Sequence, residues 1–297
     1  MSDTLAPPAT QPSLFIPHGG GPCFFMPDPN GTWTRMGEYL GALAASLPEP
    51  PRAILVISGH WEEPAFALTG TEEHPGLIFD YYGFPPETYR LTWPAPGAPW
   101  LAERGAELLR AAGLPAAIDP ERGFDHGVFV PLKVMFPAAE VPVVQMSLHA
   151  SLDPALHLAA GEALAALREE GVLVLGSGMS FHNLRAMGDL RVTEPSAEFD
   201  RWLANAAAER PAERAAQLAR WAEAPNCCGP QACRRRSTPR AASTTACSCR
   251  SRSCSRMPGC RSCRCRSTPR SIRRSTSPPE RRSRRCATKA CSCSAAV

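Results

Sequence analysis

The composition of this 297-residue chain changes abruptly after residue 226. Residues 227–297 contain no Leu, Phe, Tyr or Trp, and their only aliphatic residues larger than Ala are Ile272 and Val297. Because so few large apolar side chains cannot bury a hydrophobic core, this segment cannot supply a layer of a globular domain. The fold must therefore come from residues 1–226, which we predict to form one domain that is incomplete at its C-terminal end.

The two segments also carry opposite charge. Residues 227–297 hold 17 arginines, Lys289 and a single acid, Glu280, for a net charge of +17, whereas residues 1–226 hold 14 basic and 27 acidic side chains, for −13. The overall charge of +4 describes neither segment and does not indicate nucleic-acid binding. The first segment has one cysteine, no secretory signal and no apolar run near the ~18 residues that span a bilayer. We therefore expect a cytoplasmic protein without nucleic-acid or membrane partners.

Three interpretations of residues 227–297 compete. A zinc module needs paired Cys-x-x-Cys motifs with histidines, but the segment has one such pair, Cys260 and Cys263, and no His. A disordered basic arm explains the arginines but not 12 of the chain's 13 cysteines. The interpretation we favour is translation out of frame, because 30 arginines against two lysines indicate a GC-rich gene. Residues 237–250 can be back-translated into a shifted reading with His-Pro, then Glu-His and Leu-Leu-Pro-Leu, so we predict a frameshift-derived, disordered tail.

The first 226 residues alternate predicted strands and helices, which indicates an α/β fold: a single domain with a central, mostly parallel sheet flanked by helices. The aromatic, Pro-rich segment 77–97 has no clear period and is expected to be an ordered loop over the site. Strands are expected at 13–16, 53–57, 66–69, 116–119, 141–147 and 172–175, and helices at 34–47, 100–112, 129–136, 153–170, 196–209 and 212–223.

Several histidines occupy the positions where such sheets assemble sites. His18, His60 and His182 each follow an apolar run inside a Gly-containing loop, and His126 lies in a turn after Asp125. Strand ends of a parallel sheet meet at one edge, so we expect these side chains to converge. Neutral imidazoles are common ligands for Zn or Fe(II), and three on one face leave positions open for a substrate and O₂.

The remaining histidines are interpreted differently. His157 falls inside a predicted helix and is taken as structural, and His74 as an exposed loop residue. His149 follows a strand and either lines the site or caps the turn. Cys23 neighbours the Gly-rich loop, but we do not expect it to be catalytic.

In their order along the chain, five motifs resemble the class III extradiol ring-cleavage dioxygenases, in the branch similar to DOPA 4,5-dioxygenase. The resemblance covers roughly residues 13 to 223. The motifs are Phe-Ile-Pro-His-Gly-Gly-Gly-Pro at 15–22, Ser-Gly-His-Trp at 58–61, the aromatic segment 79–97, Asp-His-Gly at 125–127, and the stretch from Gly-Ser-Gly at 176–178 to His-Asn-Leu at 182–184.

The resemblance implies cleavage of a DOPA-like catechol ring by O₂, beside its two hydroxyls, at one divalent metal ion. Fe(II) is expected for this oxidoreductase reaction, with Zn(II) as the alternative. The implied roles are metal binding for His18 and His60, catalysis for His182 and His126, and substrate binding for His149, Tyr81 and Phe84.

Two alternatives stay open, and a departure from the family pattern supports the second. The family's third metal ligand lies in a later His-Pro motif, whereas no histidine follows His182 in this chain. A metal-dependent hydrolase on the same ligands is the first alternative. The second is a catalytically impaired binding protein with the same fold.

Overall fold

The computed structural model describes residues 8–70, 74–179 and 193–220. The predictions for His182 and for residues 227–297 therefore lie outside the described residues.

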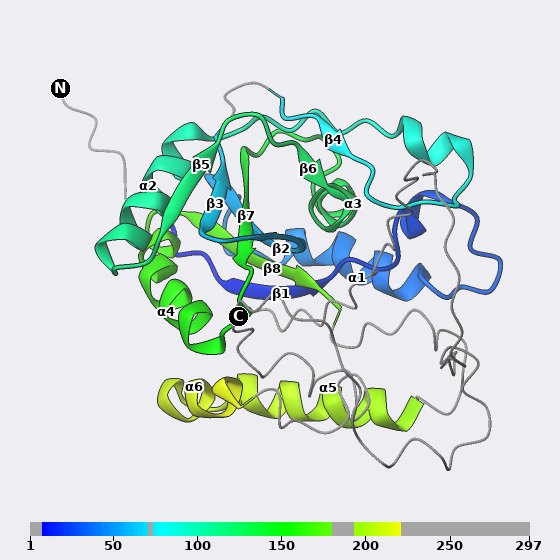
Figure 1. The fold of residues 1–297 in the computed structure, drawn as a ribbon. Coiled ribbons are helices and arrows are strands. Elements are labelled where there is room, and N and C mark those ends of the chain that lie inside the picture. Colours follow the sequence, from blue (N-terminus) through cyan, green and yellow to red (C-terminus); the bar gives the residue numbers. More distant parts are fainter. Residues whose placement is uncertain (1–7, 71–73, 180–192, 221–297) are drawn as a thin grey trace, which may run out of the picture. The chain divides into compact units, whose positions relative to one another are not determined.

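A six-stranded sheet with the order β1-β8-β2-β7-β3-β5 forms the centre of the fold (Figure 1). The pairs β1–β8, β8–β2, β2–β7 and β3–β5 are parallel, and only the β3–β7 pair is antiparallel. The predicted mostly parallel sheet is thus confirmed. Its strands are β1 (Ser13–Pro17), β2 (Ala53–Glu63), β3 (Phe66–Thr69), β5 (Ala116–Asp119), β7 (Val143–His149) and β8 (Val172–Gly178).

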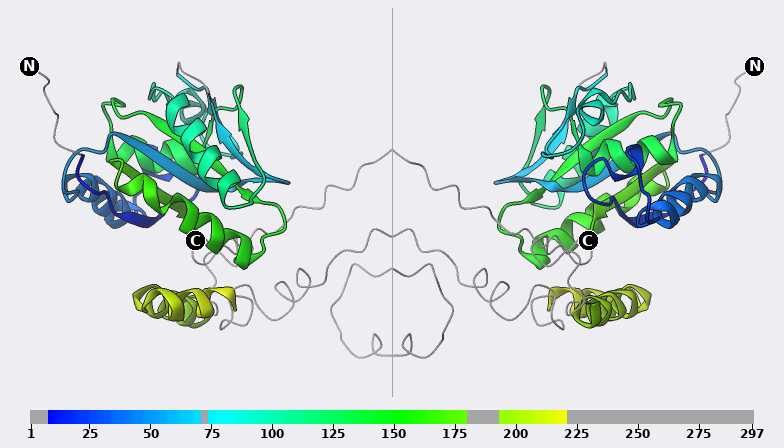
Figure 2. Two further views of the ribbon diagram at one scale, coloured as in Figure 1. Left: turned by 90° about the vertical axis from the view of Figure 1, so that its left-hand side faces the viewer. Right: turned by 90° about the vertical axis from the view of Figure 1, so that its right-hand side faces the viewer.

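Helices cover both faces of this sheet (Figures 1 and 2). Alternate residues of β2 point to opposite faces: Ile54 and Val56 join one hydrophobic cluster with α1 and α3, whereas Leu55 joins another with α2 and α4. A strand buried on both faces needs the continuous apolar run that predicted it. The helices are α1 (Thr34–Ala45), α2 (Pro99–Ala111), α3 (His126–Met135), α4 (Pro154–Leu164), α5 (Thr193–Ala208) and α6 (Pro211–Ala219).

Three expected boundaries were wrong, and the first two matter for the site. Strand β2 does not end at Ile57: its register with β7 shifts there, and pairing resumes at Glu62 with Leu148. His60 therefore lies within an irregular strand, not in a loop after it. Helix α3 begins at His126, earlier than expected, and α4 gives way after Leu164 to a 3₁₀ turn at residues 165–168.

The segment 77–97 is mostly irregular, as predicted, but it contains a short strand. Strand β4 (Leu77–Ile78) pairs in parallel with β6 (Phe124–Asp125), which immediately precedes α3. A 3₁₀ turn follows at Pro86–Arg90. This pairing brings Asp80 next to the first residue of α3.

Across the described ranges, no helix has the length and apolar character to cross a membrane.

Candidate metal centre

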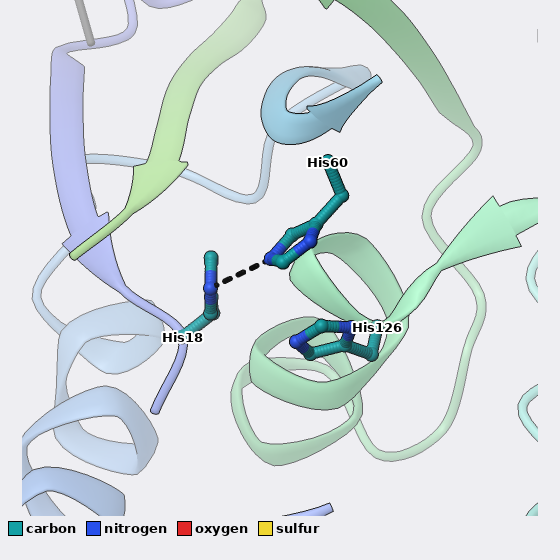
Figure 3. Close-up of side chains that lie close together, drawn as sticks. All are labelled: His18, His60 and His126. Carbon is teal, nitrogen blue, oxygen red and sulfur yellow. Dashed lines mark hydrogen bonds between the residues drawn. The ribbon is translucent and has the colours of Figure 1, made fainter. Parts of the chain in front are cut away.

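Three imidazole rings converge at one edge of the sheet (Figure 3). His18 follows β1, His60 lies in the irregular part of β2, and His126 is the first residue of α3. The ring centroids lie 4.8 Å apart for His18 and His60, 4.1 Å for His60 and His126, and 5.3 Å for His18 and His126. Each ring offers one nitrogen, and these three atoms lie within 4.8 Å of one another. Because His18 and His126 are buried and His60 is half-buried, the rings sit in a partly desolvated site.

The strand register explains why His18 and His60 meet. Strand β8 lies between β1 and β2, with Ser177 opposite Ile16 on one side and Ser58 on the other. The two strands therefore deliver their histidines to the same edge.

A glycine lets the third ring approach. A Cβ atom added to Gly127 would lie 2.6 Å from Ser58 Oγ and 3.0 Å from His60 Cδ2, closer than van der Waals contact allows. The start of α3 can thus pack against His60 only because residue 127 has no side chain.

Hydrogen bonds orient two of the rings. The Ser177 hydroxyl donates to the carbonyl oxygen of Gly127, so it accepts from His18 Nδ1, 3.1 Å away. The carboxylate of Asp80 can only accept, so His126 Nδ1 donates to Asp80 Oδ1 across 2.7 Å. In the neutral form of each ring, this hydrogen bond places the proton on Nδ1 and the lone pair on Nε2.

The Nε2 atoms of His18 and His60 lie 3.1 Å apart. When His18 is neutral, its Nε2 lone pair faces His60 Nε2, and a proton or a metal ion between the two nitrogens would satisfy it. Bonds from Zn to imidazole nitrogen are ~2.0 to 2.1 Å long, so two nitrogens 3.1 Å apart could both bind one ion. The spacing and the imidazole donors therefore fit a divalent ion of the Zn or Fe(II) type.

Carboxylates add negative charge beside the rings. Asp80 contacts His126 and lies 3.4 Å from His60 Nδ1. Burial raises the pKa of Asp80, but the hydrogen bonds from the His126 ring and backbone and the electrostatic interaction with the His126 and His60 rings outweigh burial and hold this pKa at about 2. Asp80 is therefore ionised at neutral pH.

A second carboxylate anchors the start of α3. Asp125 is 1% exposed, accepts from Ser58 Oγ at 2.7 Å and from the Gln145 amide, and its backbone N–H donates to Gln145 Oε1. Burial, with the nearby charge of Asp80, raises the pKa of Asp125 despite these hydrogen bonds. This network holds the backbone that presents His126.

Comparison with known proteins decides the family. Residues 28–242 match the model of the "Catalytic LigB subunit of aromatic ring-opening dioxygenase". The chain belongs to this LigB family.

Curated relatives agree. The dioxygenase tasH of Hapsidospora irregularis is 47% identical over 191 residues, which are 61% of this chain and 57% of the relative's length. The 4,5-DOPA dioxygenase extradiol of Portulaca grandiflora is 38% identical over 200 residues, 66% of this chain and 72% of the relative. A crystal structure of an uncharacterized protein from Escherichia coli K12 is 30% identical and covers 71% of this chain and 88% of that one, with a TM-score of 0.47. The three histidines give this LigB-family chain one candidate metal site in the part of the chain that the structure describes.

Tyr81 and Phe84 were predicted to bind substrate in this LigB-family chain. Tyr81 lies beside the histidine trio (His18, His60 and His126), and Phe84 lies against Tyr81. The Tyr81 ring meets the His126 ring edge-on at 5.7 Å, and the Phe84 ring meets Tyr81 at 5.5 Å. Gly21 has a φ of +56°, and a Cβ atom there would lie 2.8 Å from the Phe84 ring, so the Gly-rich loop after His18 packs directly on Phe84. The Tyr81 hydroxyl donates to the Thr88 carbonyl at 2.7 Å, and burial raises the pKa of Tyr81 to about 12. Tyr81 therefore contributes its ring, not an acidic hydroxyl.

The described contacts of His149 are elsewhere. Its Nδ1 lies 2.7 Å from Ser151 Oγ, its ring packs on Phe66, and its backbone N–H donates to His157 Nε2. Its role in substrate binding stays a prediction. His157 Nδ1 also donates to the Asp153 carbonyl, so both ring nitrogens of His157 serve the fold.

Cys23 is buried, and burial raises the pKa of its thiol to about 11, which disfavours a nucleophilic thiolate. Asp80 is a site residue to which the sequence analysis assigned no role. Its only sequence signal was its place in the aromatic motif after Phe79.

Proposed function

We propose that this chain is an extradiol dioxygenase that opens the ring of a DOPA-like catechol with O₂ at one metal ion bound by His18 and His60. The observation that carries the proposal is the 3.1 Å distance between His18 Nε2 and His60 Nε2 at one edge of a LigB-family sheet. The name of the Portulaca relative supports the reaction and substrate class.

A bound Fe(II) ion would supply Lewis acidity toward the phenolic oxygens and the redox capacity to react with O₂, whereas Zn(II) would supply only the first.

Among the residues that the structure describes, His126 is the proposed proton-transfer group. Its Nδ1 is committed to Asp80, so its second nitrogen is the one that can accept a proton from a phenolic hydroxyl. The Asp80 carboxylate would then pair with the positive ring. His182, which lies outside the described residues, is proposed as the second acid/base.

Tyr81 and Phe84 are proposed to form the wall that binds the substrate ring. Their edge-to-face stack next to His126 offers an apolar surface to a flat aromatic molecule and excludes water from the proton-transfer step. His149 is proposed to contact the substrate further from the trio.

The test combines metal content, oxygen uptake and product. The full chain is loaded with Fe(II) without air and given a DOPA-like catechol, and oxygen consumption is recorded beside the absorbance of the yellow ring-opened product. Ester hydrolysis without oxygen uptake would indicate the metal-dependent hydrolase instead. Catechol binding without turnover would indicate an impaired binding protein.

Three histidine variants separate the roles. His18→Ala should lose both metal and activity, whereas His126→Ala should keep the metal and lose ~10²- to 10⁴-fold in turnover, the usual contribution of an acid/base. His74→Ala changes an exposed histidine and should match the parent in both measurements. Loss of metal in His126→Ala would overturn its proposed role and make it a ligand.

A further inference from the structure

One carboxylate touches two of the three rings. Asp80 Oδ1 accepts from His126 Nδ1 at 2.7 Å and from the His126 backbone N–H at 3.0 Å. Asp80 Oδ2 lies 3.4 Å from His60 Nδ1. The two oxygens of a single side chain thus face the nitrogens of His60 and His126 that point away from the trio.

This arrangement matches the role of carboxylates around metal-binding histidines. A carboxylate can only accept, so it favours the tautomer with the proton on Nδ1 and leaves the lone pair on Nε2. Ser177 does the same for His18 through its hydroxyl. The backbone contact at His126 also fixes Asp80 itself, because the β4–β6 pairing holds both segments together.

We propose that Asp80 is a positioning residue that sets the tautomer and orientation of both His60 and His126, so that one side chain prepares two rings for the metal ion. The inference rests on the metal site of the proposed function. It adds a residue whose removal should weaken metal binding without removing any ligand.

Asp80→Asn separates this role from a merely structural one. The amide has the shape of the carboxylate, and its oxygen can still accept from His126 Nδ1 and backbone N–H. Its NH₂ group would then face His60 Nδ1 as a donor, and His60 alone should lose the proton from Nδ1. The matched control is Asp153→Asn, because Asp153 caps α4 through Ala155 N–H and asparagine caps a helix equally well.

Two measurements on the full chain test the inference. The first is Co²⁺ affinity, measured by competition with a coloured chelator and by the visible spectrum of the bound ion. Asp80→Asn should weaken binding ~10- to 100-fold, the usual effect of removing an outer partner of a metal-binding histidine. Asp153→Asn should bind as the parent does, and urea unfolding should show that both variants are folded.

The second measurement needs no metal. Nitrogen-15 NMR of the histidine rings at pH 8 should show a protonated Nδ1 at His60 and His126 in the parent. In Asp80→Asn, only His60 Nδ1 should become unprotonated. Signals are assigned with His60→Gln and His126→Gln.

The outcomes separate this inference from the function on which it rests. If the parent binds Co²⁺ and Asp80→Asn binds it equally with His60 Nδ1 still protonated, the role of Asp80 is wrong and the proposed function stands. If the parent gives no defined Co²⁺ spectrum, the proposed metal site fails. The nitrogen signals then still decide whether Asp80 sets the tautomers.

Discussion

Gly127→Ala should damage the metal site without substituting a ligand. The added Cβ would lie 2.6 Å from Ser58 Oγ and 3.0 Å from His60 Cδ2, against ~3.5 to 4.0 Å for ordinary contact. The overlap is about 1 Å with the hydroxyl and about 0.5 Å with the ring. Ser58 cannot simply rotate away, because its hydroxyl donates to the buried carboxylate of Asp125 at 2.7 Å.

The magnitude follows from two opposing effects. Overpacking of this kind costs about 1–3 kcal/mol, and replacing a helical glycine by alanine returns about 0.5–1 kcal/mol. The net loss in the free energy of unfolding should be about 1–2 kcal/mol. Because His60 is one of the two groups that must move, the 3.1 Å spacing of the Nε2 atoms should change, and Co²⁺ affinity should fall at least ~10-fold.

The assay pairs urea unfolding with Co²⁺ titration on the parent, Gly127→Ala and Gly41→Ala. Gly41 lies in α1, and a Cβ atom there meets nothing within 4 Å, so its substitution should stabilise the protein by about 0.5–1 kcal/mol and leave Co²⁺ binding unchanged. If Gly127→Ala unfolded at the parent's urea concentration and bound Co²⁺ equally well, the close packing of α3 against His60 would be refuted.

Three further outcomes are expected. Tyr81→Phe should lower the free energy of unfolding by about 1–3 kcal/mol, because it leaves the Thr88 carbonyl without its donor, and should not alter the pH profile of oxygen uptake; an altered profile would show that the hydroxyl takes part in proton transfer. Burial lowers the pKa of His157 below 6.5, so the unfolded chain takes up the proton first: the contribution to stability should be complete above pH 6.5 and decline as the pH falls toward the folded-state pKa, by at most ~1.4 kcal/mol per pH unit. The free energy of unfolding, measured in urea from pH 8 to 5, should fall in this way in the parent and not in His157→Gln. An equal dependence on pH in both proteins would contradict the prediction. Resequencing the gene across the codons for residues 225–233 and restoring the frame near residue 226 should return a His-Pro motif and, with it, tight metal binding; an unaltered frame in the source DNA would end the frameshift interpretation.

The sequence was sufficient for the sheet because its central strands are buried on both faces. Continuous apolar runs such as 53–57 and 172–175 are too short for a buried helix, and both form parallel strands. The position of His18 followed from the same logic, since β1 ends at Pro17.

Sequence patterns could not reveal the contacts between strands that lie far apart along the chain. Ser58 and Gly59 look like the end of a strand, yet β2 resumes at Glu62 because β7 continues beside it. Asp80 lies in a segment without periodicity, and only the register of Ile78 with Asp125 shows that it meets His126. Neither register can be read from local propensity, because each depends on a strand more than 40 residues away.

The orientation of the histidine rings and their affinity for a metal ion are separate properties of this site. The ring nitrogens that face away from the trio are held by Ser177 and Asp80, and the close approach of α3 depends on Gly127; all three residues precede residue 178. Orientation of the rings is therefore set within the sheet and its first helices, whatever sequence follows residue 226. A later His-Pro motif would add a ligand to rings that are already arranged, so its loss should reduce the affinity for the ion while the tautomers and the 3.1 Å spacing of His18 and His60 persist.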